Sequence, residues 1–185
     1  MTERSAAQLP AAAGPVVSAA EVRDEVDGLV AAWRRERPDL DVGPMEVLSR
    51  VTRLAHYLDR QRRTAFSRHQ LESWEFDVLA ALRRSGEPYQ LSPGQLLRET
   101  MVTSGTMTNR VDRLAARGLV TRTNRPEDRR GVLVRLTVAG KEAVDAAITD
   151  LMEAEQAILS SLPAAGRSQL AESLRQLVAP YDSGA

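Results

Sequence analysis

Arginine is concentrated in one stretch of the chain, residues 98–135, in a pattern suited to binding a polyanion. The stretch holds nine arginines against four acidic residues, whereas the whole 185-residue chain has 25 basic and 25 acidic side chains and no net charge. A basic patch confined to one motif is the electrostatic footprint of a nucleic-acid-binding surface. Any affinity for nucleic acid must therefore come from this stretch.

The helix expected between residues 103 and 117 separates its side chains into two faces. At 100° per residue, one stripe has the spacing of a core-facing side and consists of Met107, Val111, Leu114 and Ala115. The opposite face carries side chains of the types that contact base edges and phosphates: Thr106, Asn109, Arg113 and Arg117. A solvated face is the common alternative for a single amphipathic helix, but the local surplus of arginine favours DNA.

Capping signals position this helix within a larger motif. Ser92 and Gln95 form a capping box for a preceding helix over 93–101, with Pro93 at its first position. The second helix starts with Thr103 or Ser104 as its cap and ends at Gly118, a suitable C′ residue. Segments 119–123 and 132–137 alternate apolar and polar residues around RPEDRRG, which predicts a hairpin with a long loop. Helix, turn, helix and hairpin make a winged helix-turn-helix, which usually binds duplex DNA.

The flanking segments are expected to be helical. Residues 1–17 are rich in Ala, Pro and Gly and predict a disordered tail, and 18–42 contain an extra helix capped by Ser18. Further helices are expected over 44–68, over 73–84 with Ser73 as cap, and in two segments within 138–180, the first capped by Thr137. The fold class is mainly α (α+β), with the winged helix over about 72–137 and helices 44–68 and 138–180 available for dimerisation.

Two further side chains invite a functional interpretation. Helix 73–84 is apolar nearly all round, so we expect it to be buried with Asp77 inside it. A buried carboxylate needs a partner or a raised pKa, because uncompensated desolvation costs several kcal/mol. We favour a structural role for Asp77, in which it caps a neighbouring helix or pairs with an arginine, over a functional role. Trp33 lies on the apolar face of the N-terminal helix, where a core position is the simpler expectation.

Several kinds of chemistry are excluded or unsupported. The chain has no cysteine, which rules out disulfides, thiolate metal sites and cysteine nucleophiles, and its two histidines, His56 and His69, lack neighbours at metal-ligand spacing. Nucleotide-binding glycine motifs and the G-x-S-x-G motif are absent, and no apolar run has the length of a transmembrane span. We expect a cytoplasmic protein that is not an enzyme and uses no cofactor or metal.

The segment GLVTRTNRPEDRRGVLVRLT, preceded by SGTMTNRVDRL, resembles the MarR family of winged-helix transcription regulators. The family's wing pattern, Asp-x-Arg before a strand that ends Leu-Thr, is present as Asp128, Arg130, Leu136 and Thr137. The resemblance covers about 43–178 within a domain of 43–180, and implies a homodimer that binds a palindromic operator. It implies DNA contacts from Ser104, Thr106, Thr108, Asn109, Arg113, Arg117, Arg129 and Arg130, with Asp128 orienting the wing arginine.

A finer resemblance is to the urate-responsive and PecS-like branch of the family. It implies a pocket for a small anionic effector, such as urate or a related metabolite, formed by Trp33, Asp77 and Arg110. Arg110 lies at the edge of the core stripe, so it can turn toward Asp77. We hypothesise that an Asp77–Arg110 ion pair is broken by the effector, which displaces the helix and releases a repressor from DNA.

Three other functions remain open. A MarR-type regulator of drug or phenolic response would differ in its effector. A sequence-tolerant architectural DNA-binding protein would show little preference for an operator at fixed salt. A protein-interaction module built on the winged helix would keep its activity after charge reversal at Arg129 and Arg130.

Overall fold

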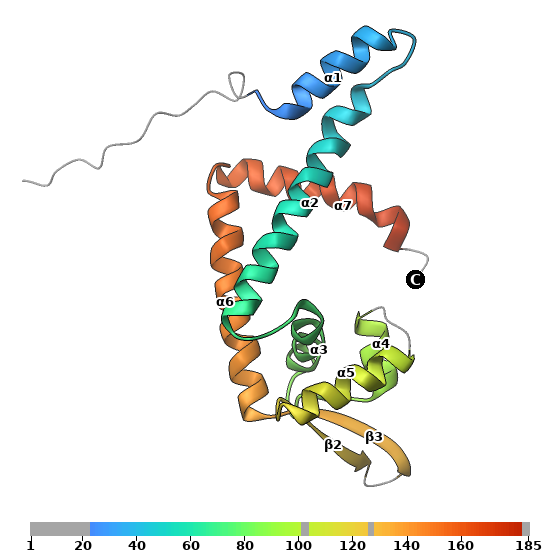
Figure 1. Ribbon diagram of the computed structural model, residues 1–185, viewed down its shortest axis with the longest axis vertical. Coiled ribbons are helices and arrows are strands. Elements are labelled where there is room, and N and C mark those ends of the chain that lie inside the picture. The colour runs from blue at the N-terminus through green and yellow to red at the C-terminus, as the bar shows by residue number, and fades with distance from the viewer. Residues whose placement is uncertain (1–22, 101–103, 126–127, 183–185) are drawn as a thin grey trace, which may run out of the picture. The chain divides into compact units, whose positions relative to one another are not determined.

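The computed structural model describes residues 23–100, 104–125 and 128–182 and divides the chain into two compact units, Met1–Ala55 and His56–Ala185. The described residues form seven helices and three strands, in the order α1 (Glu25–Glu36), α2 (Gly43–Arg68), α3 (Ser73–Arg84), β1 (Gln90–Leu91), α4 (Pro93–Thr100), α5 (Ser104–Ala116), β2 (Val120–Arg125), β3 (Asp128–Leu136), α6 (Val138–Leu159) and α7 (Ala164–Asp182) (Figure 1). The mainly helical fold with a small wing agrees with the sequence.

The first unit contains α1 and the beginning of α2. Its core is small and consists of Val26, Val30 and Val42, with Met45 packed against them. Asp24 is the N-cap of α1, since its carboxylate accepts hydrogen bonds from the backbone of Val26 and Asp27. The helix therefore begins at Glu25, and the expected start near Ser18 is wrong; Ser18 itself lies outside the described residues.

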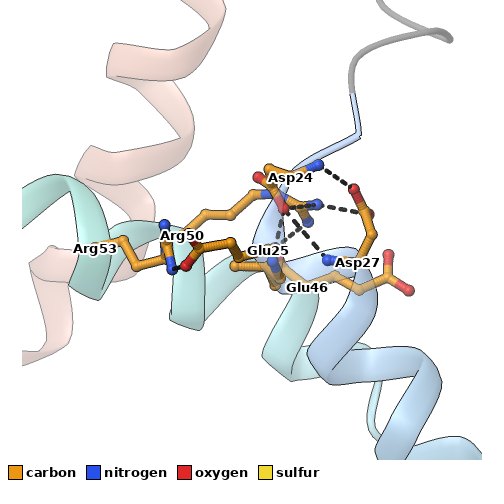
Figure 2. Close-up of polar contacts among 7 residues, drawn as sticks. Asp24, Glu25, Asp27, Glu46, Arg50 and Arg53 are labelled. Atoms are coloured by element: carbon orange, nitrogen blue, oxygen red, sulfur yellow. Dashed lines mark hydrogen bonds and ion pairs between the residues drawn. The ribbon is translucent and has the colours of Figure 1, made fainter.

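Ion pairs between α1 and α2 supplement this small core (Figure 2). Arg50 donates to the carboxylates of Asp24 (Nε–Oδ2, 2.8 Å) and Asp27 (Nη2–Oδ1, 2.7 Å), and Arg53 pairs with Glu25. These pairs lower the pKa of the Asp24 carboxyl, chiefly through its hydrogen bond with Arg50, and that of Glu25 through Arg53. These ion pairs remain in contact with water, so they add only modestly to the valine core of the first unit.

The second unit has the larger core, which joins the end of α2 to α3–α6 and the sheet. Helix α3 is its centre, because most of its residues are buried: Glu75, Phe76, Val78, Leu79, Ala80, Ala81 and Leu82. The rings of Phe66 and Phe76 stack at a centroid distance of 3.9 Å. The apolar surroundings of α3 confirm the burial expected from its sequence, although its N-cap is Glu72 and not Ser73.

The local signals around the helix-turn-helix are confirmed. The Ser92 backbone N–H donates to Gln95 Oε1 (2.8 Å), and the Gln95 N–H donates to Ser92 Oγ (3.3 Å), which is the expected capping box of α4. Gly118 has φ +71°, the left-handed conformation that ends α5 as a C′ residue. Both ends of the motif are therefore determined by short-range sequence.

The sheet is antiparallel and has the order β1-β3-β2. In the wing, Val120 pairs with Leu136 and Thr123 with Leu133, with an irregularity between Asn124 and Arg125. The two-residue strand β1, whose Leu91 pairs with Val134, was not predicted from the sequence. β1 anchors the base of the wing to the segment that leads into α4.

The end of the wing is fastened closely to α6. Thr137 caps α6 as expected, because its Oγ1 accepts a hydrogen bond from the Gly140 N–H at 3.0 Å. A Cβ atom at Gly140 would lie 2.1 Å from the carbonyl oxygen of Leu119, so only glycine permits this approach. The final helix, α7, differs, because none of its residues is buried.

Candidate nucleic-acid interface

Helix α5 presents the two faces expected from its sequence. Met107, Val111 and Leu114 are at most 2% exposed and fix the helix to the core of the second unit. The exposed polar side chains among the described ones of this helix are Thr106, Thr108, Asn109, Asp112 and Arg113. Hydroxyl, amide and guanidinium groups are the types that contact bases and phosphates. The helix therefore combines a rigid support with an accessible polar surface.

The N-terminus of α3 holds the Arg113 side chain. Arg113 Nη2 lies 3.1 Å from Glu72 Oε1, and its guanidinium carbon lies 4.7 Å from the centre of the Trp74 ring. Trp74 Nε1–H donates to the other carboxylate oxygen of Glu72 at 2.6 Å. Arg113 is thus contacted at its edge by a carboxylate and across its face by an aromatic ring. The predicted site residues did not include Glu72 or Trp74.

A second carboxylate of α3 holds the end of α5. Glu75, with an exposed fraction of 1%, accepts a hydrogen bond from Arg117 Nη1 at 2.5 Å and one from the Glu72 N–H at 2.9 Å. Arg117 Nη2 also donates to the carbonyl oxygen of Gln70 at 2.8 Å. Both terminal nitrogens of Arg117 therefore bind the protein itself, although its position on the outer face of the expected helix had indicated a DNA contact.

The expectation that Asp77 is buried is wrong. Its side chain is 47% exposed and pairs with Arg62 of α2 (Nη2–Oδ1, 3.5 Å). The carboxylate that α3 buries is Glu75, two residues earlier. The sequence did contain a signal for Glu75, because it is an acidic residue at the third position of a helix. The side chain of such a residue accepts a hydrogen bond from the backbone at the start of the helix and so stays close to the main chain.

The hypothetical Asp77–Arg110 ion pair does not occur among the described residues. The Arg110 guanidinium lies over the Trp74 ring, 5.5 Å from its centre. Arg110 and Arg113 together border an open hollow of about 540 Å³ on the outer side of α5, whose lining also includes Trp74, Thr106 and Asn109. Arg110 is therefore a cation without a carboxylate partner in the described part of the chain.

The wing carries the remaining expected contacts. Its backbone is described on both strands, and Arg122 of β2 pairs with Asp112 of α5 (Nη2–Oδ1, 2.8 Å). This exposed ion pair joins the base of the wing to α5. The side chains of Ser104, Asp128, Arg129 and Arg130 lie outside the described residues, so their expected roles stay predictions.

Trp33, the other expected effector residue, belongs to the first unit. Its side chain does not join the valine core of α1, and the residue is 44% exposed. The core position expected for Trp33 from its spacing is therefore wrong. Its proposed role in effector binding stays a prediction.

The described residues contain neither a membrane-spanning helix nor a candidate metal site. No helix among them is long and apolar enough to cross a membrane. They also hold no group of three or more histidine, aspartate or glutamate side chains arranged to bind a metal ion.

The fold and the exposed polar helix define a winged helix-turn-helix DNA-binding protein, and the comparisons with known proteins agree. Residues 69–131 match the MarR family model. The transcriptional regulator PecS of Dickeya dadantii is 41% identical over 136 residues, covering 74% of this chain and 82% of PecS. The transcriptional repressor NicR of Pseudomonas putida is 34% identical over 146 residues, covering 75% and 89%. The chain therefore belongs to the MarR family of transcriptional regulators.

A solved structure supports the same assignment. BpsR of Bordetella bronchiseptica, whose DNA binding is regulated by 6-hydroxynicotinic acid, superposes with a TM-score of 0.53 at 27% sequence identity. The match covers 69% of this chain and 98% of BpsR. The expected resemblance to MarR regulators, and to the PecS-like branch among them, is confirmed.

Proposed function

We propose that this regulator represses transcription by binding a palindromic operator with α5 in the major groove. The observation that carries the proposal is the exposed row Thr106, Thr108, Asn109 and Arg113 on a helix whose opposite stripe is buried. An amide can contact adenine in a bidentate way, and a guanidinium can contact guanine. Ser104, the first residue of α5, is also proposed to contact phosphate. The name of NicR, a repressor, supports the sign of regulation.

The wing is proposed to contact the flanking minor groove through Arg129 and Arg130, with Asp128 orienting the arginine. Its support is the position of these residues at the far end of the β2–β3 hairpin. Arg117, in contrast, is proposed to be structural, because Glu75 and Gln70 occupy its terminal nitrogens.

The test begins with genomic fragments selected by the purified protein and continues with fluorescence anisotropy on the strongest site. Asn109→Ala and Arg113→Ala are expected to weaken specific binding about tenfold or more each, since a good bidentate contact discriminates by about 1–3 kcal/mol. Arg130→Ala is expected to weaken binding to all sequences and to reduce the salt slope by about one. Equal affinity of the wild type for all fragments would instead identify a sequence-tolerant architectural protein.

The proposal includes a homodimer. Helix α7 exposes an apolar row with helical spacing, Leu170, Leu174, Leu177 and Val178, and no residue of α7 is buried within its own chain. In the first unit, Leu48, Val51 and Leu54 of α2 are likewise at least 40% exposed. A second copy is the partner that also supplies a second α5 for a palindrome. Leu174→Glu is expected to lower the mass measured by light scattering to that of one chain, whereas Gln176→Glu on the same helix leaves it unchanged.

Finally, we propose that a small anionic effector releases the protein from DNA. Regulation of BpsR by 6-hydroxynicotinic acid supports this, as does the cationic group of Arg110 beside an open hollow. The protein–operator complex is titrated with urate, xanthine, 6-hydroxynicotinic acid and salicylate, the last representing the drug and phenolic alternative. Arg110→Ala is expected to abolish release by the active compound. Trp33→Phe and Asp77→Asn test the two other predicted effector residues separately.

A further inference from the structure

The contact between the N-terminus of α3 and Arg113 has a geometry that a solvated ion pair alone does not explain. Exposed pairs contribute little, typically about 0–1 kcal/mol, because water competes for both groups. Here the side chains of Arg113 and Glu72 are 55% and 60% exposed. The carboxylate is nevertheless held from its other oxygen by Trp74 Nε1 at 2.6 Å, and the same indole ring lies under the guanidinium. One tryptophan therefore fixes both members of the pair.

Trp74 is itself held in place. It packs against the core of the second unit and belongs to the first turn of α3, next to Glu75, whose carboxylate binds the end of α5 through Arg117. The guanidinium of Arg113 is therefore positioned by a rigid element outside its own helix. The ion pair uses one terminal nitrogen of a group with five N–H donors, which leaves a donor edge for DNA.

We propose that Glu72 and Trp74 are specificity-determining residues, which orient Arg113 so that it contacts a base edge and not the nearest phosphate. Two physical effects favour this. An arginine whose side-chain conformation is fixed loses less entropy when it binds a base, and bidentate contact requires a fixed plane. In addition, the Glu72 carboxylate repels the DNA backbone, which penalises binding to every sequence alike. The inference rests on the proposed insertion of α5 into the major groove.

If Glu72 positions Arg113, its removal should change the affinity for arbitrary DNA and the preference for the selected sequence in opposite directions. Removal of the Glu72 charge raises affinity for arbitrary DNA, because one repulsion is lost, and lowers preference for the selected sequence, because Arg113 becomes free to bind phosphate. Simple inhibition, in which Glu72 withholds Arg113 from DNA, raises both affinities equally. A purely structural role lowers both together with thermal stability. The ratio of specific to non-specific affinity therefore separates positioning from either alternative.

The experiment uses the full chain and a random-sequence duplex library of about 30 base pairs, long enough for two half-sites one helical turn apart. Sequences bound by the wild type define the preferred site, and anisotropy measures affinity for this site and for sonicated mixed-sequence DNA. Glu72→Gln is expected to reduce the specificity ratio about tenfold, the value of one good base contact, and to raise mixed-sequence affinity a fewfold. Trp74→Phe keeps an aromatic ring but loses the Nε1 donor, so it lowers the ratio without raising mixed-sequence affinity.

Two comparisons make the result decisive. Glu99→Gln removes the same charge from an exposed pair on α4, Arg84–Glu99 at 3.4 Å, and is expected to leave the specificity ratio unchanged. In an Arg113→Lys background, where the planar fork is lost, Glu72→Gln is expected to have no further effect on the ratio. The proposal is overturned if Glu72→Gln leaves the ratio intact, or lowers it equally in the lysine background. If the wild type selects no sequence, the proposed function itself fails. If the wild type selects a sequence and Glu72→Gln leaves the specificity ratio intact, only the positioning role of Glu72 fails.

Discussion

Arginine–carboxylate contacts join helices in both units of the chain, but they differ in their access to water. In the first unit, Arg50 binds Asp24 and Asp27 with every side chain at least 38% exposed. In the second unit, the pair of Glu75 and Arg117 leaves only 2% of the glutamate side chain accessible. Exposed pairs are screened and exchange readily with water, whereas a buried charge that loses its partner is strongly destabilising. The end of α5 is therefore held to α3 by a contact that is costly to break, whereas the ion pairs of α1 cost little to exchange for water.

The largest expected effect is on the buried pair. Glu75→Ala leaves the Arg117 guanidinium partly buried without its carboxylate and removes an acceptor from the Glu72 N–H. We expect a loss of about 3 kcal/mol of unfolding free energy, the lower end for a broken buried pair because Arg117 remains 36% exposed. Urea denaturation followed by circular dichroism measures this loss. Glu25→Ala, which removes an exposed partner of Arg53 from the first unit, is the control and should change stability far less; an equal change would show that burial is not the cause.

Substitutions at two glycines should differ in the same direction, because one glycine is packed against backbone and the other is not. Gly140→Ala places a Cβ against the Leu119 carbonyl, a distance of 2.1 Å before relaxation, so we expect at least about 1–3 kcal/mol of destabilisation. Gly28→Ala, inside the exposed part of α1, meets no atom within 4 Å and is expected to stabilise by about 0.5–1 kcal/mol through helix propensity. Thermal melting of both variants measures the difference. Destabilisation by Gly28→Ala would indicate that this face of α1 is covered in the assembled protein.

The smallest effect concerns acid titration in the first unit. Arg50 holds the pKa of the Asp24 carboxyl below the usual 3.8, and Arg53 holds that of Glu25 below 4.5. A carboxyl whose folded pKa is lowered stabilises the fold above its unfolded pKa, and this contribution is lost as pH falls through the folded value. NMR titration of the carboxyl carbons should therefore show Asp24 protonating below pH 3.8. In Arg50→Gln the midpoint is expected to move up toward 3.8, and an unchanged midpoint would mean that the ion pair does not form in solution.

Short stretches of sequence were sufficient to predict much of the fold. The capping box of Ser92 and Gln95, the C′ residue Gly118 and the cap Thr137 all act within a few residues of the chain, and the structure confirms each one. The buried stripe of Met107, Val111 and Leu114 was likewise predictable from helical periodicity. Strand β1 was not, because two residues have no periodicity and Leu91 becomes a strand only by pairing with Val134.

The charged groups illustrate the limit of sequence reasoning. Periodicity predicted that α3 is buried but could not identify which carboxylate has an arginine within reach, and it favoured Asp77 over Glu75. The choice depends on Arg117 and Arg62, which lie 42 and 15 residues away in the chain. An apolar neighbourhood is encoded locally, whereas an ion pair requires two distant side chains to meet.

The sequence alone determined that this chain carries a basic winged helix-turn-helix, because periodicity, caps and charge are properties of short segments. It also identified Thr106, Asn109 and Arg113 as the outer face of the central helix, since 100° per residue needs no tertiary information. The contacts of the arginines on and just after that helix, in contrast, depend on tertiary packing. Arg117 binds a buried glutamate and Arg113 is held by Glu72 and Trp74, because the packing of α3 against α5 brings those groups within hydrogen-bonding distance.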